Sequence, residues 1–113
     1  MNNQKLRGMS LFANVGVAEA YLESIGVQIE VANELLADRA KFYQDVYPNS
    51  HMVCGDITDE AVRTSLIEEA KAKNVNFVMA TPPCQGMSRV GKMEEFDVRN
   101  QLIYYAVDVI KRL

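Results

Sequence analysis

The sequence predicts an α/β domain in which a parallel β-sheet carries helices on both faces. Two observations predict this fold class: short apolar segments typical of strands alternate with amphipathic segments typical of helices, and the connections between them are short. Strands joined through helices in this way form right-handed crossovers and pair in parallel. The 113 residues suffice for one small domain, and 49% of them are apolar, which is enough for a core.

The chain begins with a predicted strand, turn and helix. Residues 9–12 form a short apolar run typical of a buried strand, and residues 13–16 form a turn. Residues 17–25 have helical spacing, and their predicted buried face comprises Val17, Ala18, Tyr21, Leu22 and Ile25. Gly26 is well suited to end this helix, because glycine readily adopts the left-handed conformation there.

A second strand, a second helix and a third strand follow. Residues 27–32 alternate with period two and contain several β-branched side chains, which predicts a strand. Residues 37–47 predict a helix that Pro48 stops. Residues 51–54 predict a short third strand, and we expect its Cys54 to belong to the core.

The last part of the chain repeats the pattern. Thr58 is the expected N-cap of a helix over residues 59–73, which has acidic side chains in its first turn and lysines in its last. Residues 75–80 predict a fourth strand. Residues 86–95 contain two glycines and mixed charge, which indicates a mobile loop, and residues 97–113 return to helical spacing.

Composition narrows the classes of function. The net charge of −3 does not suit a domain that must bind nucleic acid by itself, because phosphate contacts usually require a basic face. Two cysteines and one histidine, His51, form neither a zinc pattern nor a disulfide framework. We therefore expect reduced thiols, no metal site and a cytoplasmic location. No signal peptide and no stretch of membrane-spanning length is evident in the sequence.

The candidate functional residues follow the predicted strands at their carboxyl ends, where ligands bind to parallel sheets. The turn at 12–16 precedes a helix N-terminus, and Gly16 would let a ligand approach the backbone. Glu34 could accept hydrogen bonds from both ribose hydroxyls of a nucleoside, or it could instead cap the following helix.

Two further candidates follow the third and fourth strands. Asp56 could accept a hydrogen bond from the exocyclic amine of adenine, with Ile57 packed on the base, or it could initiate the next helix. Pro82 and Pro83 restrict the backbone just before Cys84. A thiolate at the mouth of a ligand cleft could act as a nucleophile, whereas a structural cysteine usually lies within an apolar run. The residues alone leave both roles of Cys84 open.

Five sequence elements, in this order and spacing, resemble those of the DNA (cytosine-5) methyltransferases. They are Leu11-Phe12-Ala13 with Gly16, Glu34, Gly55-Asp56-Ile57, Pro82-Pro83-Cys84-Gln85 with Ser88, and Asp97-Val98-Arg99 with Leu102. The resemblance covers nearly the whole chain, and its Pro-Pro-Cys-Gln element is the most specific. It implies part of the Rossmann-like fold of the S-adenosylmethionine-dependent methyltransferases, with about four strands in the order 3-2-1-4. Asn14 and Val17 stand where the family has glycines.

The resemblance implies S-adenosylmethionine as the cofactor. It places the cofactor-binding site at Phe12, Ala13, Asn14, Gly16, Glu34, Leu35, Asp56, Ile57, Pro82 and Leu102. Phe12 and Ile57 would pack against the adenine, Asp56 would bind its amine, and Glu34 would bind the ribose.

The resemblance also gives Cys84 a role. Its thiolate would add to carbon 6 of a cytosine, so that carbon 5 becomes able to take the methyl group. The cytosine must be flipped out of the DNA duplex for this chemistry, and the loop at 86–95 would close over it.

The family's Glu-Asn-Val and Gln-x-Arg-x-Arg elements and its target-recognition region do not occur in residues 1–113. We therefore expect the N-terminal, cofactor-binding part of a longer enzyme that binds DNA as a whole and is inactive as this chain alone. The unpaired edge of the fourth strand is expected to promote self-association. The alternatives are a split subunit or non-catalytic cofactor-binding module, a tRNA cytosine-5 methyltransferase, and an NAD-dependent oxidoreductase, although the last lacks its Gly-x-Gly-x-x-Gly turn.

Overall fold

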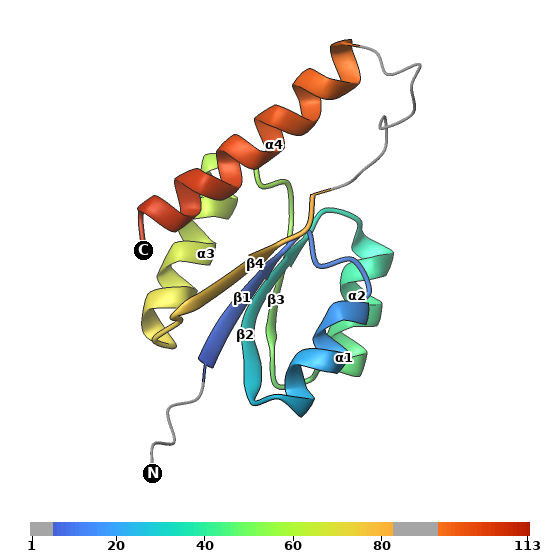
Figure 1. Cartoon of the computed structure of the whole chain (residues 1–113), viewed down its shortest axis with the longest axis vertical. Helices are drawn as coiled ribbons and strands as arrows, with labels where there is room; N and C mark the ends of the chain where they lie inside the picture. Colours follow the sequence, from blue (N-terminus) through green and yellow to red (C-terminus); the bar gives the residue numbers. More distant parts are fainter. Residues whose placement is uncertain (1–5, 83–92) are drawn as a thin grey trace.

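The computed structural model describes residues 6–82 and 93–113, with side chains up to residue 82 and from residue 101 onward. Strands and helices alternate along these residues, as predicted (Figure 1). The strands are β1 (Leu6–Leu11), β2 (Val27–Glu34), β3 (His51–Cys54) and β4 (Phe77–Ala80). The helices are α1 (Val17–Ser24), α2 (Ala37–Val46), α3 (Glu60–Ala72) and α4 (Met93–Lys111).

The strands form one parallel sheet in the predicted order, β3-β2-β1-β4. Helices α1 and α2 cover one face, and α3 and α4 cover the other (Figure 1). Because all strands run in the same direction, their carboxyl ends share one edge of the sheet. Strand β1 pairs with β2 on one side and with β4 on the other, so the strand order reverses at β1. In parallel sheets a reversal of this kind opens a crevice at the carboxyl edge.

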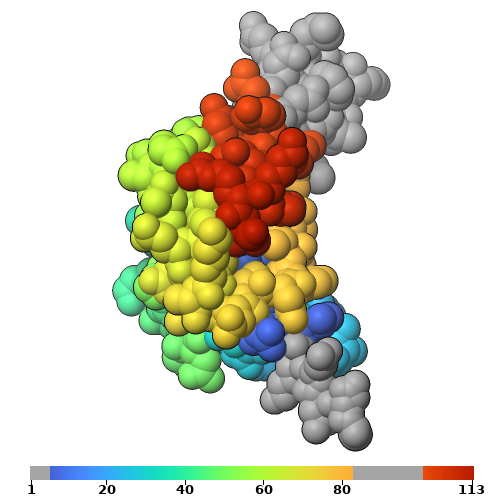
Figure 2. Space-filling view, turned by 90° about the vertical axis from the view of Figure 1, so that its left-hand side faces the viewer, coloured from blue at the N-terminus to red at the C-terminus, as the bar shows by residue number. Residues whose placement is uncertain are grey.

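Each face of the sheet has its own core. The larger core lies under α3 and α4 and contains Met9, Leu11, Val31, Leu66 and Val109, among others. The smaller one lies under α1 and α2 and centres on Tyr43, which is completely buried. The space-filling view shows α4 lying directly against α3 on the larger core's side (Figure 2). These cores hold the helices whose N-termini and preceding turns surround the crevice.

The predicted buried face of α1 is wrong for four of its five residues, and only Leu22 packs on a core. Val17, Tyr21 and Ile25 are all at least 70% exposed, whereas Glu19 is only 4% exposed. The start of the helix explains this rotation: the Tyr47 hydroxyl donates to the Gly16 carbonyl at 2.6 Å, and Gly16 packs on the Tyr43 and Tyr47 rings. This anchor turns Glu19 toward Tyr43, where burial and the Glu19 charge raise the pKa of the Tyr43 hydroxyl.

Two smaller predictions about side chains are also wrong. Cys54 is exposed rather than part of the core, because β3 is an edge strand and Cys54 is its last residue. Asp59, not Thr58, caps α3, and its carboxylate accepts a hydrogen bond from the Ala61 amide at 2.9 Å.

Of the eight elements described, only β3 has its predicted bounds. Strand β1 spans Leu6–Leu11 rather than residues 9–12, so Phe12 belongs to the turn, where its φ is 60°. Strand β2 extends to Glu34, β4 begins at Phe77, and α1, α2 and α3 differ by one residue at one or both ends.

Helix α4 begins at Met93, four residues before the predicted start, because the residues at 93–96 include methionine and glutamate, which favour helix. The predicted loop over 86–95 therefore ends before Met93, and its remaining residues lie outside the described part of the chain.

Candidate cofactor-binding site

A cavity of about 460 Å³ lies at the carboxyl ends of β1, β2 and β3. This volume falls within the range typical of small-molecule sites. The cavity brings together most of the predicted cofactor-binding residues, which are Phe12, Asn14, Glu34, Leu35, Asp56, Ile57 and Leu102. It also includes residues that were not among the predicted cofactor-binding residues, which are Asn33, Leu36, Arg39, Gly55 and Thr81. Segments far apart in the sequence thus converge on one concave surface.

The turn after β1 has a strained backbone where it borders the cavity. Phe12 has φ 60° and Asn14 has φ 56°, both in the left-handed region. Asparagine tolerates this region well, but for a bulky aromatic residue it costs about 1–3 kcal/mol. Hydrogen bonds from the Thr81 hydroxyl to the Phe12 carbonyl (3.2 Å) and from the Ala13 amide to the Asn33 carbonyl (3.0 Å) hold the turn. These hydrogen bonds hold Phe12 at the cavity wall despite the strain. Strained residues held in this way are frequent at functional sites.

Three of the predicted residues are not part of the cavity wall. Ala13 is buried in the core under α1 and α2. Gly16 is buried against the two tyrosine rings, so its lack of a side chain serves packing and the left-handed turn (φ 84°) rather than access to the cavity. Pro82 is half-buried and follows Thr81, which lines the cavity.

Glu34 is the central acidic group of the cavity. Its side chain is buried, and each carboxylate oxygen accepts one backbone hydrogen bond, from Asn14 N at 2.7 Å and from Leu36 N at 3.1 Å. These two bonds join the turn after β1 to the start of α2. Because a carboxylate offers about four lone-pair sites, two remain for donors from a ligand. Glu34 does not cap α2, since the N-cap of that helix is Leu36 and no side chain among the described residues caps it. The ligand role considered for Glu34 remains compatible with these bonds.

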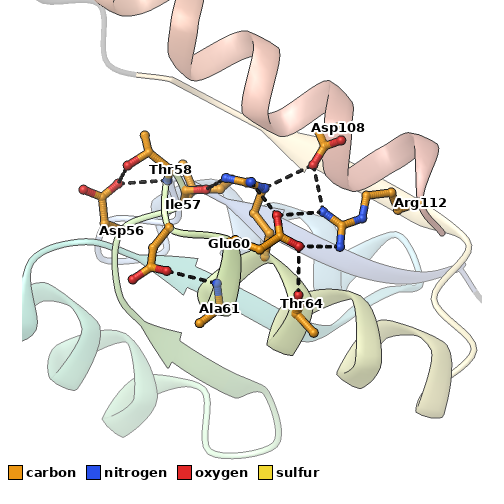
Figure 3. Close-up of polar contacts among 10 residues, drawn as sticks. Asp56, Ile57, Thr58, Glu60, Ala61, Thr64, Asp108 and Arg112 are labelled. Atoms are coloured by element: carbon orange, nitrogen blue, oxygen red, sulfur yellow. Dashed lines mark hydrogen bonds and ion pairs between the residues drawn. The ribbon is translucent and has the colours of Figure 1, made fainter.

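Asp56 and Ile57, which follow β3, also line the cavity. Oδ1 of Asp56 accepts hydrogen bonds from the Thr58 amide at 2.9 Å and from the Thr58 hydroxyl at 2.8 Å (Figure 3). Oδ2 accepts no hydrogen bond within the described part of the chain, so it could accept one from a ligand amine. Ile57 is buried and packs into the core under α3.

Asn33 is a buried polar residue that the sequence analysis missed. Its side-chain amide donates to the Val53 carbonyl at 2.8 Å and to the Gly55 carbonyl at 3.0 Å. The two bonds fix the segment that leads from β3 to Asp56. A signal for Asn33 was present, since a polar residue inside a strand buried on both faces must find specific hydrogen-bond partners.

A network of charged side chains links α3 to α4 beside the cavity (Figure 3). Arg63 forms ion pairs with Glu60 (2.7 Å) and Asp108 (3.1 Å). Arg112 pairs with the same two carboxylates at 2.9 and 3.0 Å. This network fixes the position of α4, whose Leu102 reaches the cavity wall.

The same network predicts a response to acid. Hydrogen bonds from Arg112 and Arg63 lower the pKa of Glu60 from 4.5 to about 2. A lowered carboxyl pKa contributes stability above pH 4.5, and this contribution is lost as the pH falls toward 2. As the pH falls from 4.5 to 2, we expect the urea concentration at the midpoint of unfolding to decrease less in Glu60→Gln than in the wild type. Glu68→Gln, on the same helix, should retain the wild-type acid response, and an unchanged acid response in Glu60→Gln would contradict the assignment.

Cys84, the predicted nucleophile, lies outside the described residues. The described chain nevertheless reaches the cavity at Thr81, directly after β4, and Cys84 follows three residues later in the sequence. In the part of the chain whose side chains are described, no group of three potential metal ligands occurs. None of the helices described is long and apolar enough to cross a bilayer.

Residues 6–113 match the sequence profile of the family described as C-5 cytosine-specific DNA methylase. The Type II methyltransferase M1.HgaI of Avibacterium volantium is 43% identical to this chain over 115 residues, and the match covers 97% of this chain and 32% of the relative. The tRNA (cytosine(38)-C(5))-methyltransferase of Rattus norvegicus is 23% identical, with 97% of this chain and 28% of the relative covered.

A solved structure of a prophage-encoded E. coli protein shares the fold. It superimposes with a TM-score of 0.65 at 24% identity and covers 89% of this chain and 27% of that protein. This chain therefore spans about a third or less of the length of the proteins that it matches. The profile match extends from β1 through α4 and includes every element that surrounds the cavity. This chain belongs to the C-5 cytosine-specific DNA methylase family.

Proposed function

We propose that this chain binds S-adenosylmethionine in the cavity at the carboxyl edge of the sheet. On this proposal it is the cofactor-binding part of a longer enzyme that methylates carbon 5 of cytosine in DNA. The observation that carries the proposal is the convergence of Phe12, Glu34, Asp56 and Ile57 on one cavity of suitable volume. An aromatic ring, two carboxylates with free lone pairs and an aliphatic wall match the chemistry of an adenosyl group.

Each of these residues would hold one part of the cofactor. Glu34 would accept hydrogen bonds from the ribose hydroxyls, using the lone pairs that Asn14 N and Leu36 N leave free. Asp56 would accept one from the adenine amine, while Phe12 and Ile57 pack against the base. The cofactor, when bound, supplies a methyl group on a positively charged sulfur.

Cys84 would supply the nucleophile of the complete enzyme. Its thiolate would add to carbon 6 of a flipped-out cytosine and push electron density onto carbon 5, which is otherwise too weak a nucleophile. Carbon 5 would then form a bond to the methyl group as the bond between that group and the cofactor's sulfur breaks, which leaves the cofactor as a neutral thioether. Loss of the carbon 5 proton and departure of the thiolate would release 5-methylcytosine. The likeness to Type II enzymes supports a role in a restriction-modification system, acting on DNA in the cytoplasm.

Calorimetric titration tests the binding proposal. We expect S-adenosylmethionine to bind this chain with one site and NADH to give no binding heat. Binding of NADH instead would support the oxidoreductase alternative and overturn the proposal. Absence of heat with both ligands would also overturn it for this chain.

We expect no methyl transfer to DNA by this chain alone. It contains the predicted nucleophile, but its net charge of −3 does not favour contacts with DNA phosphates, and the family's Glu-Asn-Val element and target-recognition region do not occur in residues 1–113. The measurement is incorporation of radiolabelled methyl groups into cytosine-containing DNA. Incorporation that Cys84→Ser abolishes would contradict this expectation.

We also expect the chain to self-associate through β4. This strand pairs with β1 on one side, and within the described residues it has no strand partner on the other. Open strand edges favour pairing with another chain. Light scattering after gel filtration should give a mass that rises with concentration, and a constant monomer mass would contradict this expectation.

RNA is a second candidate substrate. The similarity to a tRNA (cytosine(38)-C(5))-methyltransferase over 97% of this chain favours it, although the Type II relative is more similar. Assay of the full-length enzyme with duplex DNA and with tRNA separates the two. Methylation of tRNA alone would overturn the DNA assignment and leave the cofactor proposal intact.

A further inference from the structure

Arg63 contacts two segments that line the cavity, although its own side chain does not line it. Its guanidinium donates to the Ile57 carbonyl at 2.9 Å and pairs with Asp108 of α4 at 3.1 Å. The same group lies 4.7 Å from the centre of the Tyr105 ring, also on α4. Arg63 is only 9% exposed, so these contacts are made away from bulk solvent.

The contacts of Arg63 join the two segments that carry Ile57 and Leu102. Ile57 belongs to the turn between β3 and α3, and Leu102 lies one helical turn before Tyr105 on α4. Both side chains line the cavity. The guanidinium therefore links the turn to the helix through polar contacts, in addition to the apolar packing of Ile57 and α4 in the larger core.

We propose that Arg63 is a positioning residue of the cofactor site, which acts through Ile57 and α4 without touching the ligand. The proposal rests on the proposed function, namely that the cavity holds an adenosyl group. It gives a reason for the burial of an arginine at this point. Its terminal nitrogens donate to Ile57 and Glu60, whereas Nε makes no hydrogen bond among the residues described and is compensated by the Asp108 charge at 3.1 Å.

Arginine suits this role better than lysine does. Its planar guanidinium offers five donors in fixed directions, so it can serve the Ile57 carbonyl, Glu60 and Asp108 together. A lysine ammonium keeps the charge but cannot reach all three at once. Arg63→Lys should thus keep the charge of the network while it loosens the placement of Ile57.

Arg112 provides a matched control. It pairs with the same carboxylates, Glu60 and Asp108, and its side chain is 36% exposed. Unlike Arg63, it neither donates to the Ile57 carbonyl nor lies over the Tyr105 ring. Arg112→Lys therefore perturbs the link between α3 and α4 without perturbing the turn that carries Ile57.

The first measurement is the affinity for S-adenosylmethionine by calorimetry, at a temperature where both variants are folded. We expect Arg63→Lys to weaken binding about 10-fold and Arg112→Lys to weaken it less than about 3-fold. If Arg63→Lys does not fold, Asp108→Asn serves instead, because it leaves the bond to Ile57 in place. It removes the ion pairs of both Arg63 and Arg112 with Asp108, so its effect is compared with that of Arg112→Lys. It should weaken binding by an intermediate factor. Equal losses in the arginine variants would overturn the proposal.

A double-mutant cycle separates positioning from general destabilisation. In an Ile57→Ala background, Arg63→Lys should cost less than about 3-fold in affinity, because the side chain that it positions is gone. In a Leu35→Ala background, at the ribose end of the cavity, the loss of about 10-fold should remain. The same loss in both backgrounds would show a structural role alone and would overturn the proposal.

An NMR spectrum of the ligand-free protein distinguishes failure of this proposal from failure of the proposed function. The methyl resonances of Ile57 should shift or broaden in Arg63→Lys and stay close to wild type in Arg112→Lys. If the wild type does not bind S-adenosylmethionine, the proposed function fails and Arg63 has no cofactor site to position. If the wild type binds but the Ile57 resonances are unchanged in Arg63→Lys, the positioning proposal alone fails.

Discussion

Glu34→Gln is expected to weaken the binding of S-adenosylmethionine by about 100-fold, which corresponds to about 2.7 kcal/mol. The charged carboxylate would accept from both ribose hydroxyls, and hydrogen bonds to charged groups are worth about 1.5–3 kcal/mol each. Glutamine has one acceptor oxygen, so its amide nitrogen must face either Asn14 N or Leu36 N. The substitution thus removes a ligand contact and also disturbs the turn that shapes the cavity.

Calorimetry on the folded variant measures this loss of affinity. Glu30→Gln is the matched control, because Glu30 lies on the same strand but does not line the cavity. It should bind the cofactor as the wild type does. An affinity loss below about 5-fold in Glu34→Gln would contradict the ribose role of Glu34.

Gly16→Ala is expected to lower the free energy of unfolding by about 2–4 kcal/mol. The residue has φ 84°, where an L-residue costs about 1–2 kcal/mol. A Cβ at this position would also overlap the Tyr47 ring and lie 3.0 Å from the Tyr43 ring. Overpacking of this kind costs about 1–3 kcal/mol, and Tyr43 cannot move away easily because it is completely buried.

Gly26→Ala isolates the backbone part of this cost. Gly26 has φ 87°, but an added Cβ there would meet nothing within 4 Å. Urea unfolding should therefore give a loss of about 1–2 kcal/mol for Gly26→Ala and roughly twice that for Gly16→Ala. Equal losses would mean that the tyrosine rings do not constrain the turn.

Much of the fold was predictable because its signals are local. The strand β3 was predicted with its observed bounds, since Pro48 stops the preceding helix and the turn that includes Gly55 follows. The order of the strands came from the family resemblance, not from the residues themselves. The orientation of α1 was not predictable from its apolar spacing, because the anchor of Gly16 on Tyr43 and Tyr47 lies about 30 residues away in sequence.

The residues of the candidate site were also predictable only where their signals are local in the sequence. Glu34 and Asp56 were found because carboxylates at strand ends are visible in the sequence, and the cavity contains both. Asn33 and Arg63 were missed, because their importance depends on which carbonyl groups they reach across the fold. Cys84 remains a prediction from the resemblance, since it lies outside the described residues.

Mapping of amide chemical shifts during titration with S-adenosylmethionine tests the central claim most directly. A second cavity, of about 320 Å³, lies near the start of β2 and the end of α2, where Gln28, Pro48 and Ser50 contribute to its wall. We predict shifts at Phe12, Asn14, Glu34, Asp56 and Ile57 and none around this second cavity. Shifts confined to the second cavity, or no shifts at a saturating concentration of the cofactor, would contradict the assignment of the carboxyl edge as the cofactor site.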